Sequence, residues 1–292
     1  MDERDPPGER PSDQPIGVFD SGLGGLTVAR AVRAALPGER IAYLGDTARL
    51  PYGSKSGATV VHYSLLSARF LSARGIKLLV VACNTASAFA LDELRARLPL
   101  PVLGVVEPGA DEAVAATRSG RIGVIGTLGT VRSGSYARAI AARDPAARVT
   151  AVACPLLVPL VEEGWLGGGD SATAEVRAAH AVIERYLGEL RDCDPDLDVI
   201  VLGCTHYPLL RPLIAATAAR LFAREVRLVD SAVAMAGAAA RELGRLGLLR
   251  QGAPIGDADA IDCYVTDETR LAELGARFLG HPLDRVERVD LV

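Results

Sequence analysis

The stretch IGVFDSGLGG at residues 16–25 runs from a short apolar segment into a glycine-rich loop, and a helical pattern follows it. A similar stretch, IGVIGTLGT, occupies residues 122–130 and also continues into a helical pattern. A strand, a loop of small residues and a helix form the beginning of a βαβ unit. The repetition therefore predicts two related α/β units within one chain.

Two further apolar segments repeat in the same order, and each ends at a cysteine. LLVVACNTAS (78–87) contains Cys83, and DVIVLGCTHY (198–207) contains Cys204. Apolar runs alternate with segments of helical period, such as 61–73 and 173–190, which predicts parallel sheets. The predicted strands lie at residues 16–19, 41–44, 78–82, 102–106, 122–125, 149–153, 199–202 and 226–229. Ligands of such sheets bind beyond the carboxyl ends of the strands, and both cysteines fall there.

The composition narrows the class of protein. The 292 residues carry a formal net charge of −4, which leaves no overall positive field for a nucleic acid. Residues 1–14 are charged and proline-rich, which predicts a disordered tail, and no apolar run is long enough to span a membrane. The five cysteines are odd in number and lack a CxxC pair, which disfavours a disulfide framework and a zinc site. We expect a cytoplasmic protein without a metal, nucleic-acid or membrane partner.

Cys83 and Cys204 both follow a predicted buried strand, at the point where a helix should begin. The positive end of the helix dipole favours a thiolate there, although a single cysteine in this setting is more often a small core residue. His206 lies two residues after Cys204 and can exchange a proton with it. Two thiols in matching loops suit a reaction that removes a proton from one face of a carbon and returns one to the other face.

Two polar loops are candidates for substrate binding. Asp20–Gly25 offers backbone N–H groups, a carboxylate and a hydroxyl, and Pro51–Ser54 offers the amides of a tight turn. Either loop is also explained by an ordinary turn. Glu162 and Glu163 look like ordinary acids near a helix end, with at most a minor part in the site.

Nothing in the sequence indicates a bound cofactor. A pyridoxal phosphate enzyme needs a Schiff-base lysine, and the chain contains only Lys55 and Lys77. Lys55 lies in the tight turn and Lys77 begins a strand, so neither has the expected setting. We expect a reaction that proceeds without a cofactor.

Several of these segments, in order and spacing, resemble the bacterial glutamate racemases. The segments are FDSGLGGLTV (19–28), GDTARLPYGSKS (45–56), ACNTAS (82–87), GVIGTLGT (123–130), CPLLVPLVEEG (154–164) and GCTHYPLL (203–210). The resemblance implies pyridoxal-independent interconversion of L- and D-glutamate, which supplies D-glutamate for peptidoglycan. It also implies two pseudo-symmetric, doubly wound α/β domains with mainly parallel sheets and an active site in the cleft between them.

The resemblance also assigns roles to individual residues. Cys83 and Cys204 would be the proton donors and acceptors, with Cys204 acting on L-glutamate and Cys83 on D-glutamate, and Asp20 and His206 would assist them. The substrate would be bound by Asp20, Ser21, Tyr52, Gly53, Asn84, Thr85, Thr127, Thr205 and His206.

Domain boundaries and partners follow from the same resemblance. The first domain would comprise residues 15–105 and 226–292, and the second residues 106–225. The segment from Gly252 onward shows no pattern of the family. A homodimer is expected, and an interaction with DNA gyrase is a secondary prediction.

Other functions fit some of the same residues. A racemase for aspartate or a hydantoin, or a cis–trans isomerase, would keep both cysteines and change the pocket. A cysteine hydrolase would use one cysteine with His206 as its base and leave the second cysteine idle. A binding protein directed at gyrase would need neither thiol.

Overall fold

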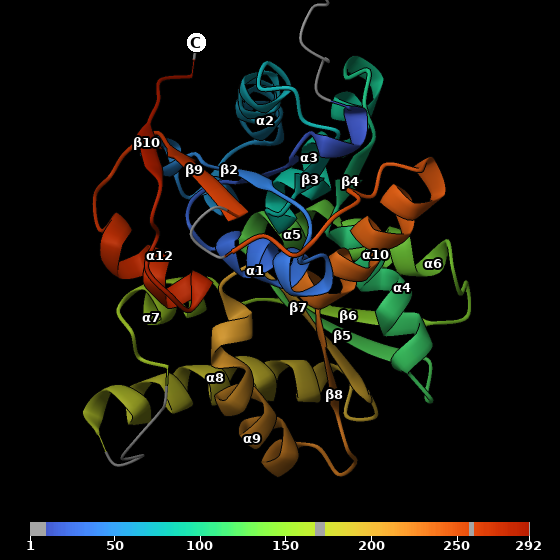
Figure 1. The fold of residues 1–292 in the computed structure, drawn as a ribbon. Helices are drawn as coiled ribbons and strands as arrows, with labels where there is room; N and C mark the ends of the chain where they lie inside the picture. The colour runs from blue at the N-terminus through green and yellow to red at the C-terminus, as the bar shows by residue number, and fades with distance from the viewer. Residues whose placement is uncertain (1–9, 167–172, 257–259, 292) are drawn as a thin grey trace, which may run out of the picture.

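The chain folds into two parallel sheets that are covered by helices (Figure 1). The computed structural model describes residues 10–166, 173–256 and 260–291. The first sheet has the strand order β10-β9-β2-β1-β3-β4, and the second has the order β6-β5-β7-β8. All the strand pairs in these described ranges are parallel. The predicted α/β fold is therefore confirmed.

Each apolar run predicted as a strand overlaps one. The strands are β1 (Ile16–Asp20), β2 (Ile41–Gly45), β3 (Leu78–Val81), β4 (Val102–Gly104), β5 (Arg121–Gly126), β6 (Arg148–Ala153), β7 (Val199–Gly203), β8 (Arg227–Asp230), β9 (Ile261–Val265) and β10 (Val286–Arg288). The α-helices are α1 (Leu26–Ala35), α2 (Gly57–Ser72), α3 (Asn84–Arg97), α4 (Val106–Ala116), α5 (Leu128–Ser133), α6 (Ser135–Ala141), α7 (Leu157–Glu162), α8 (Ala174–Cys193), α9 (Arg211–Leu221), α10 (Ser231–Leu246) and α12 (Leu271–Leu279). Short 3-10 helices are η1 (Pro11–Asp13), η2 (Thr47–Arg49), η3 (Tyr52–Ser54) and η4 (Tyr207–Leu210).

Both faces of each sheet are buried, which explains why the strands read as continuous apolar runs. In β7, Val199 and Val201 pack with α4 and α6 on one face, whereas Ile200 and Leu202 pack with α8 and α9 on the other. Figure 1 shows α8 and α9 below the second sheet, with α4 and α6 beside it. Within the described segments, no helix is both long and apolar enough to cross a membrane.

The two sheets share the same central topology. β1 lies between β2 and β3, and β5 lies between β6 and β7. The chain leaves each central strand toward one side and returns on the other, which creates a topological switch point beside that strand. Phe19 lies opposite Val81 at the first switch point, and Gly126 lies opposite Gly203 at the second. The loops after β3 and β7, which begin with the residues predicted to be catalytic, are therefore equivalent.

Glycines allow the loops of the two sheets to approach one another closely. A Cβ atom on Gly24 would lie 2.4 Å from Thr205 Oγ1, and one on Gly53 would lie 2.8 Å from Thr127 Cβ. The hydroxyl of Thr27 donates to the carbonyl of Thr205 across the same boundary, at 3.1 Å. The loops therefore close on each other and leave a narrow space between the sheets.

The structure differs from the predicted boundaries at two places. Residues 1–9 of the predicted tail lie outside the described residues, but residues 11–13 form η1, and the carbonyl of Ser12 accepts a hydrogen bond from Lys77 Nζ at 2.7 Å. β8 pairs with β7 in the second sheet, although a boundary near residue 225 would place it in the first domain. The segment after Gly252, in which no strand is predicted, contributes β9, β10 and α12, and β9 pairs with β2 in the first sheet.

Lys77 forms a buried ion pair at the amino end of β3, opposite the end that leads to Cys83. Its ammonium contacts the carboxylate of Glu39, and the two side chains are 1% and 3% exposed. The Lys77→Met variant should lose about 3–5 kcal/mol of unfolding free energy, because it leaves a buried carboxylate without its partner. Urea denaturation measures this loss.

A matched control is Arg245→Met, which removes an exposed ion pair with Glu242. That variant should lose about 1 kcal/mol or less. Replacing both buried partners, as Lys77→Met with Glu39→Leu, should restore most of the stability because no charge is left unpaired. Equal losses for Lys77→Met and Arg245→Met would contradict the importance of the buried pair.

Candidate active site

A cavity of about 380 Å³ lies where the loops that follow the strands of both sheets meet. It is large enough for a small ligand. The predicted site residues that line it are Ser21, Tyr52, Gly53, Cys83, Asn84, Thr85, Thr127, Cys204, Thr205 and His206. The structure thus brings together residues that are nearly two hundred positions apart in the sequence. Among the predicted catalytic and substrate-binding residues, only Asp20 is not part of the lining.

Cys83 belongs to the wall that the first sheet provides. Its Sγ accepts a hydrogen bond from the N–H of Ala86 in the first turn of α3, at 3.4 Å, and its S–H donates to Ser21 Oγ at 3.5 Å. The sequence predicts that this helix terminus favours a thiolate. Burial and the negative charge of Asp20 outweigh it, however, and raise the pKa of Cys83 to about 12. At neutral pH Cys83 is therefore a thiol.

Cys204 belongs to the wall of the second sheet and lies beside a charged histidine. Its Sγ is 3.9 Å from His206 Nδ1, and His206 Nε2 is 3.0 Å from a carboxylate oxygen of Glu162. Burial lowers the pKa of His206, but the hydrogen bonds and negative charges of Cys204 and Glu162 raise it to about 10. An imidazolium at neutral pH therefore faces the sulfur of Cys204 and stabilises negative charge on it.

Asp20 lies behind the cavity wall at the end of β1 and is 1% exposed. One carboxylate oxygen, Oδ2, accepts the N–H of Gly22 at 3.0 Å, whereas Oδ1 is buried without a hydrogen-bond partner. Burial raises the pKa of Asp20, and the charge of His206 opposes that rise. The side chain of Asp20 is thus not part of the cavity lining.

Polar groups at the start of α3 face the cavity from the first sheet. The Oδ1 atom of Asn84 accepts the hydroxyl of Tyr136 at 2.7 Å, which orients the amide and leaves Nδ2 as a buried donor without a partner. The hydroxyl of Thr85 lies 2.9 Å from that of Thr127 across the boundary between the sheets. Thr127 also caps α5, because its Oγ1 accepts the N–H of Thr130 at 3.2 Å. These groups can donate to an anionic ligand.

The hydroxyl of Tyr52 is not directed to a ligand. It donates to Asp46 Oδ2 at 2.6 Å, and Thr266 donates to the other oxygen of the same carboxylate at 3.0 Å. Burial and the charge of Asp46 raise the pKa of Tyr52 well above its ordinary value, so the phenol stays protonated. The backbone N–H groups at the start of η3, including that of Gly53, precede its first hydrogen-bonded turn and remain available.

Glu162 is closer to the site than the sequence predicts, because it lines the cavity and pairs with His206. Its position at the end of a short apolar segment looks like a solvent-facing acid, and only the fold brings it to the imidazole. Glu163, by contrast, is exposed and pairs with Arg270. An apolar wall was also missed, and it is formed by Leu50, Leu128, Pro155, Val158 and Pro159.

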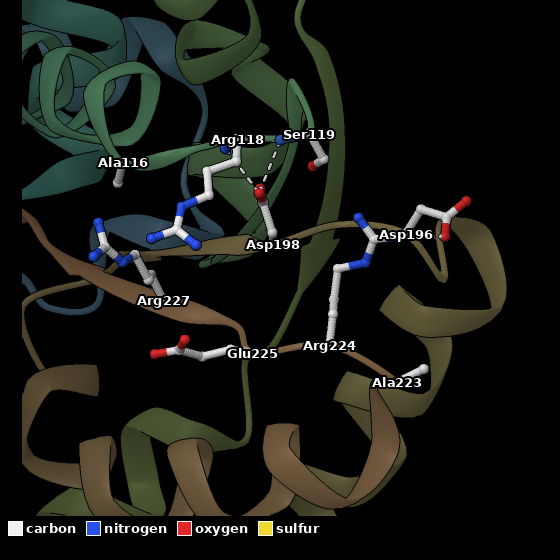
Figure 2. A pocket seen from close by; sticks show the side chains of 9 residues that line it. All are labelled: Ala116, Arg118, Ser119, Asp196, Asp198, Ala223, Arg224, Glu225 and Arg227. Carbon is white, nitrogen blue, oxygen red and sulfur yellow. Dashed lines mark hydrogen bonds and ion pairs between the residues drawn. The ribbon is translucent and has the colours of Figure 1, made fainter.

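A second cavity, of about 410 Å³, lies at the opposite end of the second sheet, beside the starts of β5, β7 and β8 (Figure 2). Arg224 pairs there with Asp196 at 3.0 Å, and Asp198 accepts the backbone N–H groups of Arg118 and Ser119. Its charged lining contains no cysteine or histidine. Within the described ranges, no group of three or more His, Cys, Asp or Glu side chains is placed to hold a metal ion.

Comparison with known proteins places the chain in a family. The Asp/Glu/Hydantoin racemase family matches residues 26–239. The chain is 50% identical to a curated glutamate racemase of Geobacter metallireducens, over 94% of this chain and 96% of that protein.

Two crystal structures of glutamate racemases have the same fold. The Francisella tularensis enzyme in complex with D-glutamate has a TM-score of 0.84 and 32% identity, covering 96% of this chain and 98% of that one. The Thermus thermophilus enzyme in complex with β-chloro-D-alanine has a TM-score of 0.81 and 43% identity, with the same coverage. The chain therefore belongs to the Asp/Glu/Hydantoin racemase family, and the glutamate racemases are its relatives there.

Proposed function

We propose that this protein interconverts L- and D-glutamate by proton transfer between two cysteines, without pyridoxal phosphate. The observation that carries the proposal is that Cys83 and Cys204 line one cavity from equivalent loops of the two sheets. A substrate held between these loops presents opposite faces of its α-carbon to the two sulfurs. The curated relatives that share about half of the sequence are glutamate racemases, which favours glutamate over aspartate or a hydantoin.

The surroundings of the two thiols differ in the way that the reaction needs. Cys204 removes the α-proton of L-glutamate, and the imidazolium of His206, 3.9 Å from its sulfur, stabilises negative charge on that sulfur. Cys83, whose pKa is raised to about 12, is a thiol and delivers a proton to the other face. D-glutamate reacts in the opposite direction after the two sulfurs exchange roles. The charge of Asp20 makes Cys83 the stronger base once it is deprotonated.

Polar groups around the cavity bind the two carboxylates of the substrate. We assign the donors Asn84 Nδ2 and the hydroxyls of Ser21, Thr85, Thr127 and Thr205 to the end of the substrate that carries the α-carbon. The N–H groups at the start of η3 bind the distal carboxylate, as the first N–H groups of a helix do for anions. Donors that are already oriented stabilise the negative charge that develops on the α-carboxylate during proton removal.

The biological context is proposed by analogy with the same relatives. The D-glutamate would supply peptidoglycan synthesis in the cytoplasm, and the protein would act as a homodimer. We propose domain boundaries near residue 105 and after Asp230, where β8 ends. An interaction with gyrase stays a prediction, and a supercoiling assay with a Cys83→Ala, Cys204→Ala double variant tests it independently of catalysis.

Exchange of the α-proton in D₂O tests the two-thiol reaction. The wild-type protein, without added cofactor, should deuterate and invert both enantiomers of glutamate, and neither Cys83→Ser nor Cys204→Ser should invert either one, because each lacks a donor on one face. Proton NMR and optical rotation measure both events.

The control for this experiment is Cys193→Ser, since Cys193 is exposed and lies outside the cavity. It should racemise like the wild type. If only one of the two cavity cysteines proves necessary, the single-nucleophile hydrolase becomes the better explanation. No exchange by the wild type would refute both substrate and mechanism.

Glu162→Gln tests the charge state of His206. Losing the carboxylate should lower the pKa of His206 from about 10 toward 6.5, and an NMR titration of the imidazole measures that change. The kcat/KM should fall on the order of 10-fold or more. The kcat/KM values for L-glutamate and for D-glutamate must fall by the same factor, because the two enantiomers have equal free energies in water.

Glu162→Gln should also change how the unfolding free energy depends on pH. Folding raises the pKa of His206, so protonation of this imidazole stabilises the folded state. That contribution to the unfolding free energy is complete below pH 6.5 and is lost as the pH rises to about 10. The difference in unfolding free energy between wild type and Glu162→Gln should therefore shrink between these pH values. A difference that grows with pH would contradict the assigned charge.

A further inference from the structure

The segment after β9 contacts residues that support both walls of the cavity. Behind the first wall, Thr266 donates to Asp46, which also accepts the hydroxyl of Tyr52, and the N–H of Asp267 donates to Thr47 Oγ1 at 2.8 Å. On the second wall, Arg270 and α12 contact the end of α7, which carries Glu162. Figure 1 shows α12 next to α7. The region in which the sequence shows no family pattern therefore touches the most charged part of the site.

Arg270 makes the central contacts of this region. One guanidinium nitrogen is 2.7 Å from the carboxylate of Glu163, and another donates to the backbone carbonyl of Glu162 at 2.8 Å and to Glu273 at 3.1 Å. Arg270 has a φ of 58°, which is uncommon for a residue other than glycine. The residue keeps this backbone conformation at the point where α12 begins and its side chain turns toward α7.

Arg277 and Phe278 strengthen the same contact from the next turns of α12. Arg277 donates to the carbonyls of Val161, at 3.2 Å, and of Glu162. The ring of Phe278 meets the imidazole of His206 edge to face, with centroids 4.8 Å apart. Two guanidinium groups and one aromatic ring thus fix the backbone of Glu162 and the ring of its partner.

The end of α7 needs such support. α7 has six residues, too few for a helix that is stable by itself, and Glu162 is its last residue. The last carbonyls of a helix lack partners within it, and its C-terminal dipole disfavours a carboxylate. Arg270 and Arg277 donate to these carbonyls from the neighbouring α12 segment and so cap α7. Glu163 neutralises the charge of Arg270, and Glu273 neutralises that of Arg277. The two arginines therefore support the end of α7 through their hydrogen bonds more than through their net charge.

We propose that Arg270 is a positioning residue for proton transfer at Cys204: by capping α7 it holds the carboxylate of Glu162 against His206. The inference rests on the proposed racemase reaction and extends it to a segment that contains no recognised motif. Its effect reaches the sulfur through successive contacts, from Arg270 to Glu162, from Glu162 to His206 and from His206 to Cys204. Arg270 itself touches neither thiol.

The test compares Arg270→Ala with Arg245→Ala, which removes an exposed arginine from an ion pair on α10. The first readout is the titration of His206 by NMR, in a chain with four histidines to assign. The charged groups that face His206 are Cys204, Glu162 and Asp20. Arg270→Ala should lower the pKa of His206 because Glu162 moves away, and Arg245→Ala should leave it unchanged.

The second readout is a double-mutant cycle with Glu162→Gln. Alone, Arg270→Ala should reduce kcat by about 10-fold or more, with a smaller change in KM, because a displaced acid–base partner slows proton transfer more than binding. In the Glu162→Gln background it should cause little further loss. Losses that multiply in the double variant, or an unchanged pKa of His206, would overturn the proposal.

Arg270→Lys covers the case in which the alanine variant does not fold. It keeps the charge but can make only one of the two bonds to the end of α7, so the pKa of His206 should be intermediate. A wild-type value in this variant would also overturn the proposal. If the wild type does not racemise glutamate, the proposed function fails, and the titration of His206 still decides the role of Arg270.

Discussion

Parallel pairing of β1 with β3, and of β5 with β7, is the constraint on which the site depends. Each pair brings two carboxyl ends together at a switch point, and loops that leave adjacent carboxyl ends must share the space above them. The loops at the two switch points approach one another closely because glycines leave room for the side chains of the opposite loop. A cavity lined by matching loops follows from this arrangement before any catalytic residue is considered.

The matching loops differ in charge, so the two cysteines have different surroundings. Asp20 ends β1, whereas Gly126 ends β5, so a carboxylate occupies this position on the side of Cys83 and a glycine occupies it on the side of Cys204. On the other side, His206 and Glu162 place a positive charge next to Cys204. Pseudo-symmetry therefore supplies two equivalent positions with different charged neighbours, and the proposed reaction assigns proton donation to one and proton removal to the other.

The sequence predicts the features of this protein that depend on local patterns, namely the strands and the polar loops. The strands are apolar because both sheet faces are buried, and the loops at the cavity contain recognisable polar motifs. Glu162 was underestimated because its partner is 44 residues away, and the sequence contains no local sign of that contact. The raised pKa of Cys83 was not foreseen because burial outweighs the helix terminus. β9 and α12 were missed since their contacts are with distant elements.

The glycines that bring the loops together also limit how this site can change during evolution. Gly24, Gly53 and Gly129 each lie against an atom of the opposite loop, so a side chain at any of them would push the walls apart. The apolar residues that line the cavity, such as Leu128 and Val158, are free of this constraint, so a change in substrate preference is easier there. A descendant protein can acquire a wider pocket there and still retain both thiols and the backbone that holds them.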